Sequence, residues 1–385
     1  MNYLINTTYK KAAHHIIVVS GLLFSIFSFV YLYCFQCDVV QALHYSLSQG
    51  KTYYSYLIGA IIVTIILVIL ARLVQRSTKI DPLYLSWSFF PSFVCLSLLT
   101  DIDYSVYLND GSSLKWIWVL LALVVVFFGM NHLFRLLSKL IPEEKKTASV
   151  LYISNLIILL VLAGIPITIS NTNINFHHEL AVEKAIHDTD YKRALKVGYK
   201  SLETSRTLTA LRAYAMSLSG ENGIGEYLFS YPQPYASDGL LFPPQSKHVL
   251  RINTDSIYNY LGEKQLPNES VSQYLARLYN TQSGTFKVLD YYLASLLLDK
   301  KLDLFSKTVN DCFFKEDTLP RYYKEALILH HQLSGSNQTV VNDSLMNRRF
   351  NEFAKEQQKY GAWIIEKNKI RREFGDTYWW YYYYQ

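Results

Sequence analysis

Hydrophobic residues gather in five long runs within the first 170 residues, and polar loops separate these runs. A helix needs about 20 mostly apolar residues to cross the hydrocarbon core of a membrane. The runs predict membrane spans at about residues 16–35, 55–74, 83–100, 115–134 and 149–169. We therefore expect an all-α protein whose residues 1–170 form a five-helix transmembrane bundle.

The third run differs from the other four because polar residues and a proline interrupt it. It contains Pro91 together with Ser86, Ser88, Ser92 and Ser97. A membrane helix tolerates such residues where neighbouring helices satisfy the freed backbone groups. We therefore predict that this span faces other helices rather than lipid.

The loops between the runs differ in positive charge. Lys and Arg in short loops remain on the cytoplasmic side of a membrane. One set of loops carries nine such residues, and the other set carries Lys51 and Lys115 alone; the nine are Lys10, Lys11, Arg72, Arg76, Lys79, Arg135, Lys139, Lys145 and Lys146. This asymmetry predicts a cytoplasmic N-terminus. Five crossings then place residues 171–385 outside, in the periplasm of a bacterial inner-membrane protein.

Beyond the fifth run the hydrophobic spacing changes to the three- and four-residue intervals of amphipathic helices. The pattern resembles successive tetratricopeptide-like helix pairs, so we predict a soluble α-helical-repeat domain, an α-solenoid, over residues 171–385. An ordinary helical bundle is the alternative. The helices are expected at about residues 177–188, 190–203, 206–219, 254–262, 270–280, 285–299, 302–314, 320–334 and 343–360.

Two unusual segments of this domain are candidate partner-binding surfaces. Tyr231 and Tyr235 flank a segment that contains prolines at 232 and 234, and proline breaks helices. Seven consecutive aromatic residues, at 378–384, include Trp379. An exposed run of this kind is a liability in water. Either segment could instead pack within its own domain, and the aromatic run could lie at the membrane surface.

Charge narrows the class of partner. The net charge of the whole chain is +6, of which residues 171–385 contribute 26 − 24 = +2 and residues 1–170 contribute 11 − 7 = +4. The second part therefore has mixed charge, without the basic stripe and interleaved aromatics of nucleic-acid binders. We expect membrane lipid and an envelope protein as partners, and no nucleic acid.

Cysteine and acidic residues offer a few candidates for chemistry. Cys34 and Cys37 form a C-x-x-C pair that could be a disulfide or a redox pair in an oxidising compartment. A thiol oxidase would need a second pair, which the sequence lacks. Asp38, Asp101 and Asp103 lie in outward loops, where enzymes acting on lipid-linked sugars place a catalytic acid.

Metal and cofactor sites are not indicated. Glu179, Glu183 and His187 follow one another at four-residue intervals and share a helix face. A metal site needs about three converging ligands. The same spacing arises on solvated helix faces, which is the interpretation that we favour. No nucleotide-binding loop or complete catalytic set accompanies them, so a binding role is favoured over catalysis.

Four short segments resemble one family. They are LFSYP at residues 228–232, SDGLL at 237–241, LPRYYKEA at 319–326 and FGDTYW at 374–379. The combination resembles uncharacterised Bacteroidota membrane proteins that pair a polytopic N-terminal region with a helical, tetratricopeptide-like tail. The resemblance covers mainly residues 177–385. It implies this architecture and a location in the bacterial envelope, and it brings no known activity.

Together these patterns predict a multi-pass inner-membrane protein that presents a periplasmic helical-repeat domain to a protein or peptide partner. Tyr231, Tyr235 and Trp379 are the residues expected to contact that partner. The alternative is an envelope enzyme that acts on a lipid-linked sugar, with Asp38, Asp101 or Asp103 as its acid.

Overall fold

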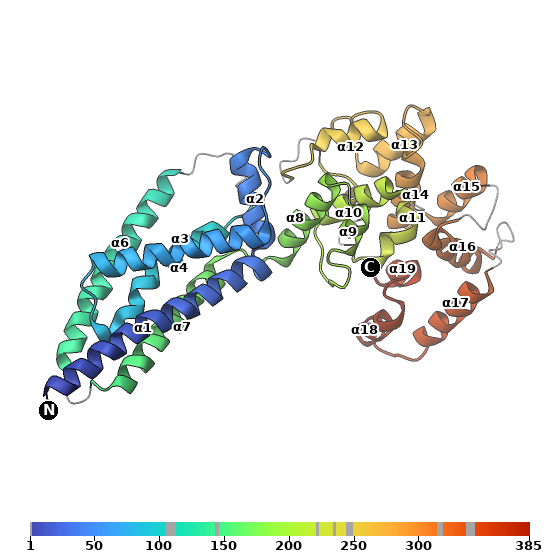
Figure 1. The fold of residues 1–385 in the computed structure, drawn as a ribbon. Helices are drawn as coiled ribbons and strands as arrows, with labels where there is room; N and C mark the ends of the chain where they lie inside the picture. Colours follow the sequence, from blue (N-terminus) through green and yellow to red (C-terminus); the bar gives the residue numbers. More distant parts are fainter. Residues whose placement is uncertain are drawn as a thin grey trace. The chain divides into compact units, whose positions relative to one another are not determined.

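The computed structural model describes residues 2–104, 113–142, 146–220, 223–233, 236–243, 249–313, 319–335 and 343–385. Within these residues the chain is helical and contains no strand (Figure 1). It divides into two compact units, Met1–Asn173 and Ile174–Gln385, called unit 1 and unit 2 below. The prediction of an all-α fold is confirmed.

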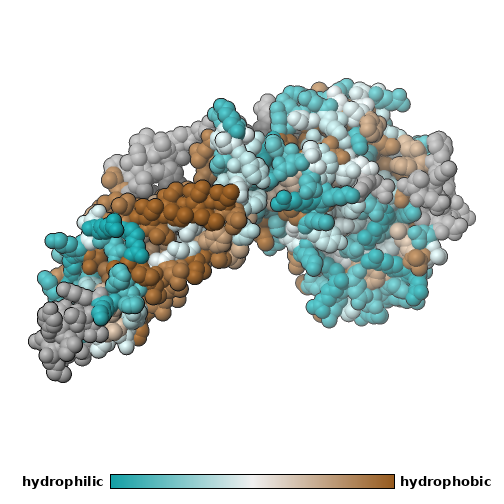
Figure 2. All heavy atoms as spheres, viewed as in Figure 1, coloured by the Kyte–Doolittle hydropathy of each residue, from teal (hydrophilic) through white to brown (hydrophobic). Residues whose placement is uncertain are grey.

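Unit 1 contains five segments that are long and apolar enough to cross a membrane: Lys11–Phe35, Tyr56–Ser77, Pro82–Thr100, Leu121–Leu140 and Ala148–Ile169. Figure 2 shows hydrophobic residues over the outside of these helices, and Leu22, Ile66 and Leu160 are among the exposed side chains. Such a surface is stable in lipid and not in water. The prediction of five membrane-length helices is therefore confirmed.

The helices of unit 1 follow this pattern closely, with two short irregular segments. A single π-turn, η1 (Tyr31–Phe35), ends the first helix, and a 3₁₀ helix, η2 (Pro82–Phe89), precedes α4. The α-helices are α1 (Asn2–Val30), α2 (Cys37–Ser48), α3 (Tyr56–Ser77), α4 (Phe90–Thr100), α6 (Ser113–Leu140) and α7 (Ala148–Ile169).

The third membrane-length segment is the inner one. It is 72% buried, whereas the other four are 17–39% buried. Its η2 part has a kink at Tyr84, where the backbone leaves the helical region. Neighbouring helices pack on both of its parts, as its proline and serine content predicted. This prediction is confirmed.

Asn155, on α7, ties the irregular start of this segment to its neighbour. Its Oδ1 accepts a hydrogen bond from the Ser86 amide at 2.7 Å, and its Nδ2 donates to the Leu83 carbonyl at 3.1 Å. Ser154, on the same helix, also donates to the Leu83 carbonyl, at 2.7 Å. In lipid no water can satisfy backbone groups that a 3₁₀ helix leaves free, so these side chains do.

Replacing Asn155 with leucine should therefore destabilise unit 1 by about 1–3 kcal/mol, because it leaves buried backbone groups without partners. The measurement is the midpoint of unfolding in mixed detergent micelles with increasing dodecyl sulfate. Thr168→Val on the same helix is the control, since the Thr168 hydroxyl bonds only within α7 and is exposed. Equal midpoints for the two variants would contradict this role of Asn155.

Unit 2 is an array of helices in which consecutive members pack on one another; α13 packs on α14, α14 on α15, and α15 on α16. The array begins with α8 (Ile174–His187), α9 (Tyr191–Lys196), α10 (Arg206–Ser219) and α11 (Ile224–Tyr227). It continues with α12 (Thr254–Leu261), α13 (Val271–Thr281), α14 (Val288–Leu298), α15 (Leu302–Cys312) and α16 (Arg321–Ser334). It ends with α17 (Ser344–Gln357), α18 (Trp363–Phe374) and α19 (Tyr378–Tyr384).

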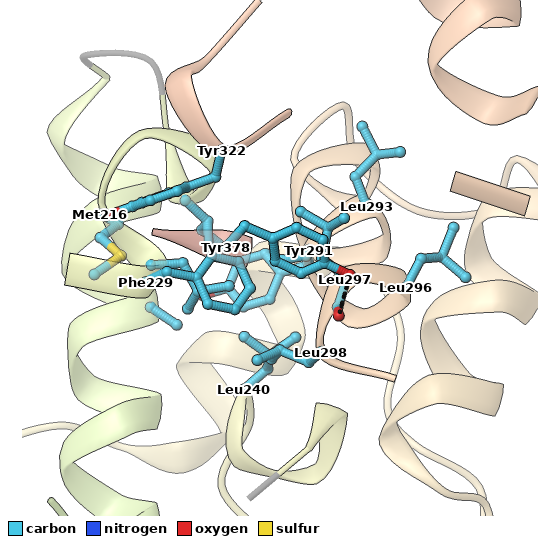
Figure 3. Packing of buried hydrophobic residues seen from close by; sticks show 14 of the residues in the cluster. Met216, Phe229, Leu240, Tyr291, Leu293, Leu296, Leu297, Leu298, Tyr322 and Tyr378 are labelled. Carbon is cyan, nitrogen blue, oxygen red and sulfur yellow. Dashed lines mark hydrogen bonds between the residues drawn. The ribbon is translucent and has the colours of Figure 1, made fainter. Parts of the chain in front are cut away.

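The aromatic run forms α19 and lies inside unit 2. Trp379 is 0% exposed, and Tyr378 and Tyr381 are also buried. The Tyr378 hydroxyl donates to the Leu297 carbonyl at 3.1 Å, the dashed line of Figure 3, and the Tyr381 hydroxyl donates to the Leu298 carbonyl at 2.8 Å. The last carbonyls of a helix have no partner within it. The tail therefore caps α14 and completes the core.

Candidate functional site

Two cavities in unit 2 share one stretch of wall. The first has a volume of about 890 Å³ and the second about 790 Å³. Tyr199, Lys200, Ser201 and Tyr231 line both of them. Volumes in this range suit a drug-sized ligand or a short peptide segment.

The second cavity brings together the two segments that the sequence marked as unusual. Tyr231 and Pro232 come from the proline-interrupted segment, and Trp380 and Tyr381 come from α19. Phe229 joins the two, because its ring lies 4.8 Å from the ring of Tyr381. The remaining polar lining comes mainly from α18 and the turn that follows it: Asn368, Arg371, Arg372 and Asp376.

The three residues predicted to contact a partner have different positions. Tyr231 is 5% exposed, and its hydroxyl donates to the Leu195 carbonyl, so it acts as wall rather than as a free surface ring. Trp379 is fully buried, and its indole donates to the Glu325 carbonyl at 2.8 Å. It could meet a partner only after α19 had left the core. Tyr235 lies outside the described residues.

A buried ionic network supports the wall of the second cavity. Glu325 Oε2 accepts the Tyr378 amide at 2.7 Å, and its Oε1 lies 2.9 Å from Arg321 Nε. Arg321 also contacts Asp376, a lining residue, at 3.0 Å. Burial raises the pKa of Glu325 to about 7, although the Arg321 charge opposes that shift. The network therefore holds the start of α19 in place.

The first cavity has a basic rim. Lys192 and Lys196 are on α9, Lys200 follows it, and all three lysines are exposed. Gly198 has φ +62°, a left-handed conformation that ends the helix. Opposite, α8 contributes His178. Burial lowers the pKa of His178, and the nearby charge of Arg212 lowers it further, so the imidazole is neutral at pH 7.

Arg212, on α10, lies behind this cavity wall and is 2% exposed. Its guanidinium lies 4.3 Å from the centre of the Tyr231 ring and donates to the carbonyls of Val197 and Gly198 at 3.2 and 3.4 Å. Among the described residues it forms no ion pair with a carboxylate, and its Nε has no hydrogen-bond partner. Burial lowers its pKa to about 10.

Two acids of the helix face that carries Glu179, Glu183 and His187 form hydrogen bonds with structural partners. Glu179 accepts a hydrogen bond from the Ser205 hydroxyl at the start of α10. Glu183 accepts the amides of Arg251 and Ile252 and faces the Arg251 guanidinium. The described residues contain no cluster of three or more His, Cys, Asp or Glu arranged to hold a metal ion.

The cysteine and acidic residues that are candidates for a catalytic role lie in unit 1. Cys34 and Cys37 are free thiols, and burial, with Asp38 second, raises the pKa of Cys37 to about 11. A thiol with so high a pKa is a poor nucleophile, since the thiolate is the reactive form. The disulfide between these two residues stays a prediction.

The acids of the alternative enzyme reading occupy two places in unit 1. Asp38 lies in the first turn of α2 and accepts a hydrogen bond from the Tyr56 hydroxyl at 3.5 Å. Asp101 and Asp103 follow α4. Burial raises the pKa of Asp101, and the charge of Asp103 raises it further. A raised pKa is what a general acid needs, and this is the feature of these acids that fits catalysis.

Sequence reasoning missed the cavity residues of α9 and Arg212. Lys192, Lys196 and Lys200 are four residues apart, a spacing that aligns side chains along a helix face, so this signal was present. No comparable signal marks Arg212, because nothing local distinguishes a buried arginine from a solvated one.

Comparison with known families matches the chain to the Family of unknown function (DUF6057), over residues 106–271 and 265–385. Comparisons with curated proteins and with solved structures found no significant match. The two matched stretches meet and cover residues 106–385, which is most of the chain and includes all of unit 2. The chain belongs to the Family of unknown function (DUF6057).

Proposed function

We propose that this protein is a membrane-anchored binding protein, and that unit 2 takes a protein or peptide segment in the second cavity. One observation carries this proposal: the proline-interrupted segment and the aromatic helix, far apart in sequence, line the same cavity. Aromatic walls with adjacent arginines are typical of protein-recognition surfaces. Tyr231, Pro232 and Trp380 would contact the segment, and Arg371 and Arg372 would orient it.

We also propose the setting in which it acts. The charge asymmetry of the loops supports a cytoplasmic N-terminus and a unit 2 outside the cytoplasm, in the periplasm of a bacterium. The neighbour-on-neighbour packing of α13 to α16 supports a tetratricopeptide-like repeat. The contact of α16 with α19 departs from that pattern, because it joins helices that are not consecutive.

The test is photo-crosslinking in the native membrane, with a photoreactive amino acid in place of Asn368, an exposed residue of α18 that lines the cavity. We expect a discrete adduct with a protein of the envelope. The same probe at Leu345 on α17, which is 78% exposed and lies outside both cavities, should give none. Arg372→Glu should reduce the Asn368 adduct at least several-fold.

Arg348→Glu on α17 is the matched control for the charge reversal, because Arg348 is exposed and outside the cavity. Equal adducts from positions 368 and 345, or an adduct that survives Arg372→Glu, would reject the second cavity as the binding site. A lipid-linked sugar recovered in place of a protein would instead favour the enzyme reading. Asp38, Asp101 and Asp103 would then be the residues to replace.

A further inference from the structure

We propose that the first cavity binds the phosphate group of an anionic membrane lipid, with Lys192, Lys196 and Lys200 around the phosphate and the tyrosines against the apolar part of the molecule. This site shares Lys200 and Tyr231 with the peptide site proposed above. Lys192 and Lys196 line it alone, and Arg372 lines only the peptide site, so the two can be tested separately.

The charge of the cavity lining favours an anionic ligand. Its described lining contains three lysines and no Asp or Glu. Among the described residues Lys196 and Lys200 form no ion pair, although lysines elsewhere in unit 2, such as Lys184 and Lys264, pair with aspartate. Like charges held close together repel unless a counter-ion lies between them. A phosphate group supplies both the charge and the acceptor oxygens.

Arg212 gives a second, independent reason to expect an anion in the first cavity. A buried cation is costly unless it is paired, and this one is 2% exposed without a carboxylate partner among the described residues. Its guanidinium reaches the cavity wall at Gly198, since a Cβ at Gly198 would lie 2.9 Å from the Arg212 Nη2. An anion in the cavity would offset this charge at a distance. Arg212 acts here through its field, because it does not itself line the cavity.

His178 contributes a polar atom that has no protein partner. Its Nδ1 is buried and has no hydrogen-bond partner among the described residues. The same Nδ1 lies 2.6 Å from the position of a Cβ at Gly198. The imidazole of His178 and the guanidinium of Arg212 therefore pack against the one glycine of the wall, where a Cβ would overlap both.

The apolar part of the lining favours a lipid over a free phosphate compound. Ile174, Leu195, Tyr199 and Tyr227 line the cavity, and Ile174 and Tyr199 are 52% and 53% exposed. Tyrosine with lysine is the composition of membrane-interface surfaces. Ile174 also follows Ile169, the last residue of α7, by five positions, and five residues span at most about 18 Å. A lipid headgroup is therefore within reach of the site.

The test is native mass spectrometry of the full chain in a neutral detergent, titrated separately with short-chain phosphatidylglycerol, short-chain phosphatidylcholine and inorganic phosphate. Phosphatidylglycerol should bind more tightly than the zwitterionic phosphatidylcholine. Lys196→Gln with Lys200→Gln should weaken phosphatidylglycerol binding by roughly 10- to 30-fold, since each lysine near a lipid surface contributes about fivefold. Both lysines are exposed, so the double variant should fold.

The matched control is Lys264→Gln with Lys355→Gln, which removes the same charge from exposed positions outside the cavity. It should leave phosphatidylglycerol binding unchanged. Equal loss in both double variants, or no loss in either, would overturn the proposal. A different result is that inorganic phosphate binds the wild type, but not the double variant, as tightly as phosphatidylglycerol does. That result would overturn the assignment of a lipid as the ligand and would indicate a soluble phosphate compound.

The peptide proposal is checked in the same samples. Arg372→Glu should leave phosphatidylglycerol binding intact, because Arg372 lines only the second cavity. Loss of the protein adduct with retained lipid binding would then separate the two sites.

Discussion

Replacing Trp379 with alanine is expected to lower the free energy of unfolding of unit 2 by about 3–5 kcal/mol. The indole ring is fully buried and lies 5.0 Å from the Phe350 ring and 6.0 Å from the Phe353 ring. Its Nε1 donates to the Glu325 carbonyl. The variant therefore loses a large packed volume and leaves that carbonyl without its indole donor. Denaturant unfolding of the full chain in detergent, followed by hydrogen exchange of α14 and α16 peptides, measures the effect.

Trp363→Ala provides the matched control, because the same side chain is removed from a position that is 57% exposed. It should cost less than about 1 kcal/mol, as surface substitutions usually do. Exchange rates in α14 that are the same in the two variants would show that the tail does not complete the core. A large loss in the Trp363 variant would point instead to the start of α18.

Glu325→Gln is expected to gain about 3 kcal/mol of stability relative to the wild type between pH 4.5 and pH 8. Burial raises the pKa of Glu325 from 4.5 to about 7 in the folded chain. An acid whose pKa is raised by folding contributes stability that is present below its unfolded pKa and lost as the pH rises through its folded pKa. The wild type therefore loses this contribution between about pH 4.5 and pH 7, and the variant does not.

The measurement is the difference in unfolding free energy between the two proteins as a function of pH. All other titrating groups are shared, so their contributions cancel in the difference. A difference that stays constant between pH 4.5 and pH 8 would show that the ion pair with Arg321 offsets the burial of the carboxylate. Arg321 is 26% exposed in its side chain and keeps its contact with Asp376, so it is not left unpaired in the variant.

Periodicity was sufficient to predict most of the helices, and local breaks explain where it failed. Each of the nine helices expected between residues 177 and 360 has a counterpart in the structure. The one expected at 190–203 ends early, at Lys196, because the left-handed backbone of Gly198 follows. Helices α11, α18 and α19 were missed; α11 has only four residues, and the hydrophobic residues of α19 form a continuous run without helical spacing.

In unit 1, α2 was missed for a related reason. Its apolar face is short, and it follows directly on a π-turn that ends the first span. The buried position of the third span was predictable, because serine and proline in a membrane helix require protein neighbours. The 3₁₀ geometry of η2 was not, since Asn155, which bonds its backbone, lies on a helix that is distant in sequence.

The candidate site was only partly predictable. The proline-interrupted segment and the aromatic run were recognised as unusual by composition alone. That Pro232 and Trp380 line one cavity depends on how α16 and α19 pack, which no local pattern encodes. Trp379 lies in the core, which is the alternative of packing within its own domain that composition left open, and its contact with a partner stays a prediction.

The hydroxyl bonds that join α19 to α14 have a consequence in alkali. Burial raises the pKa of Tyr378 and of Tyr381 above that of free tyrosine. Both hydroxyls must keep their protons in order to donate to the carbonyls of Leu297 and Leu298. A raised tyrosine pKa contributes stability that is full below about pH 10 and is lost above it. The helix that closes the core in neutral solution is thus one that alkali weakens.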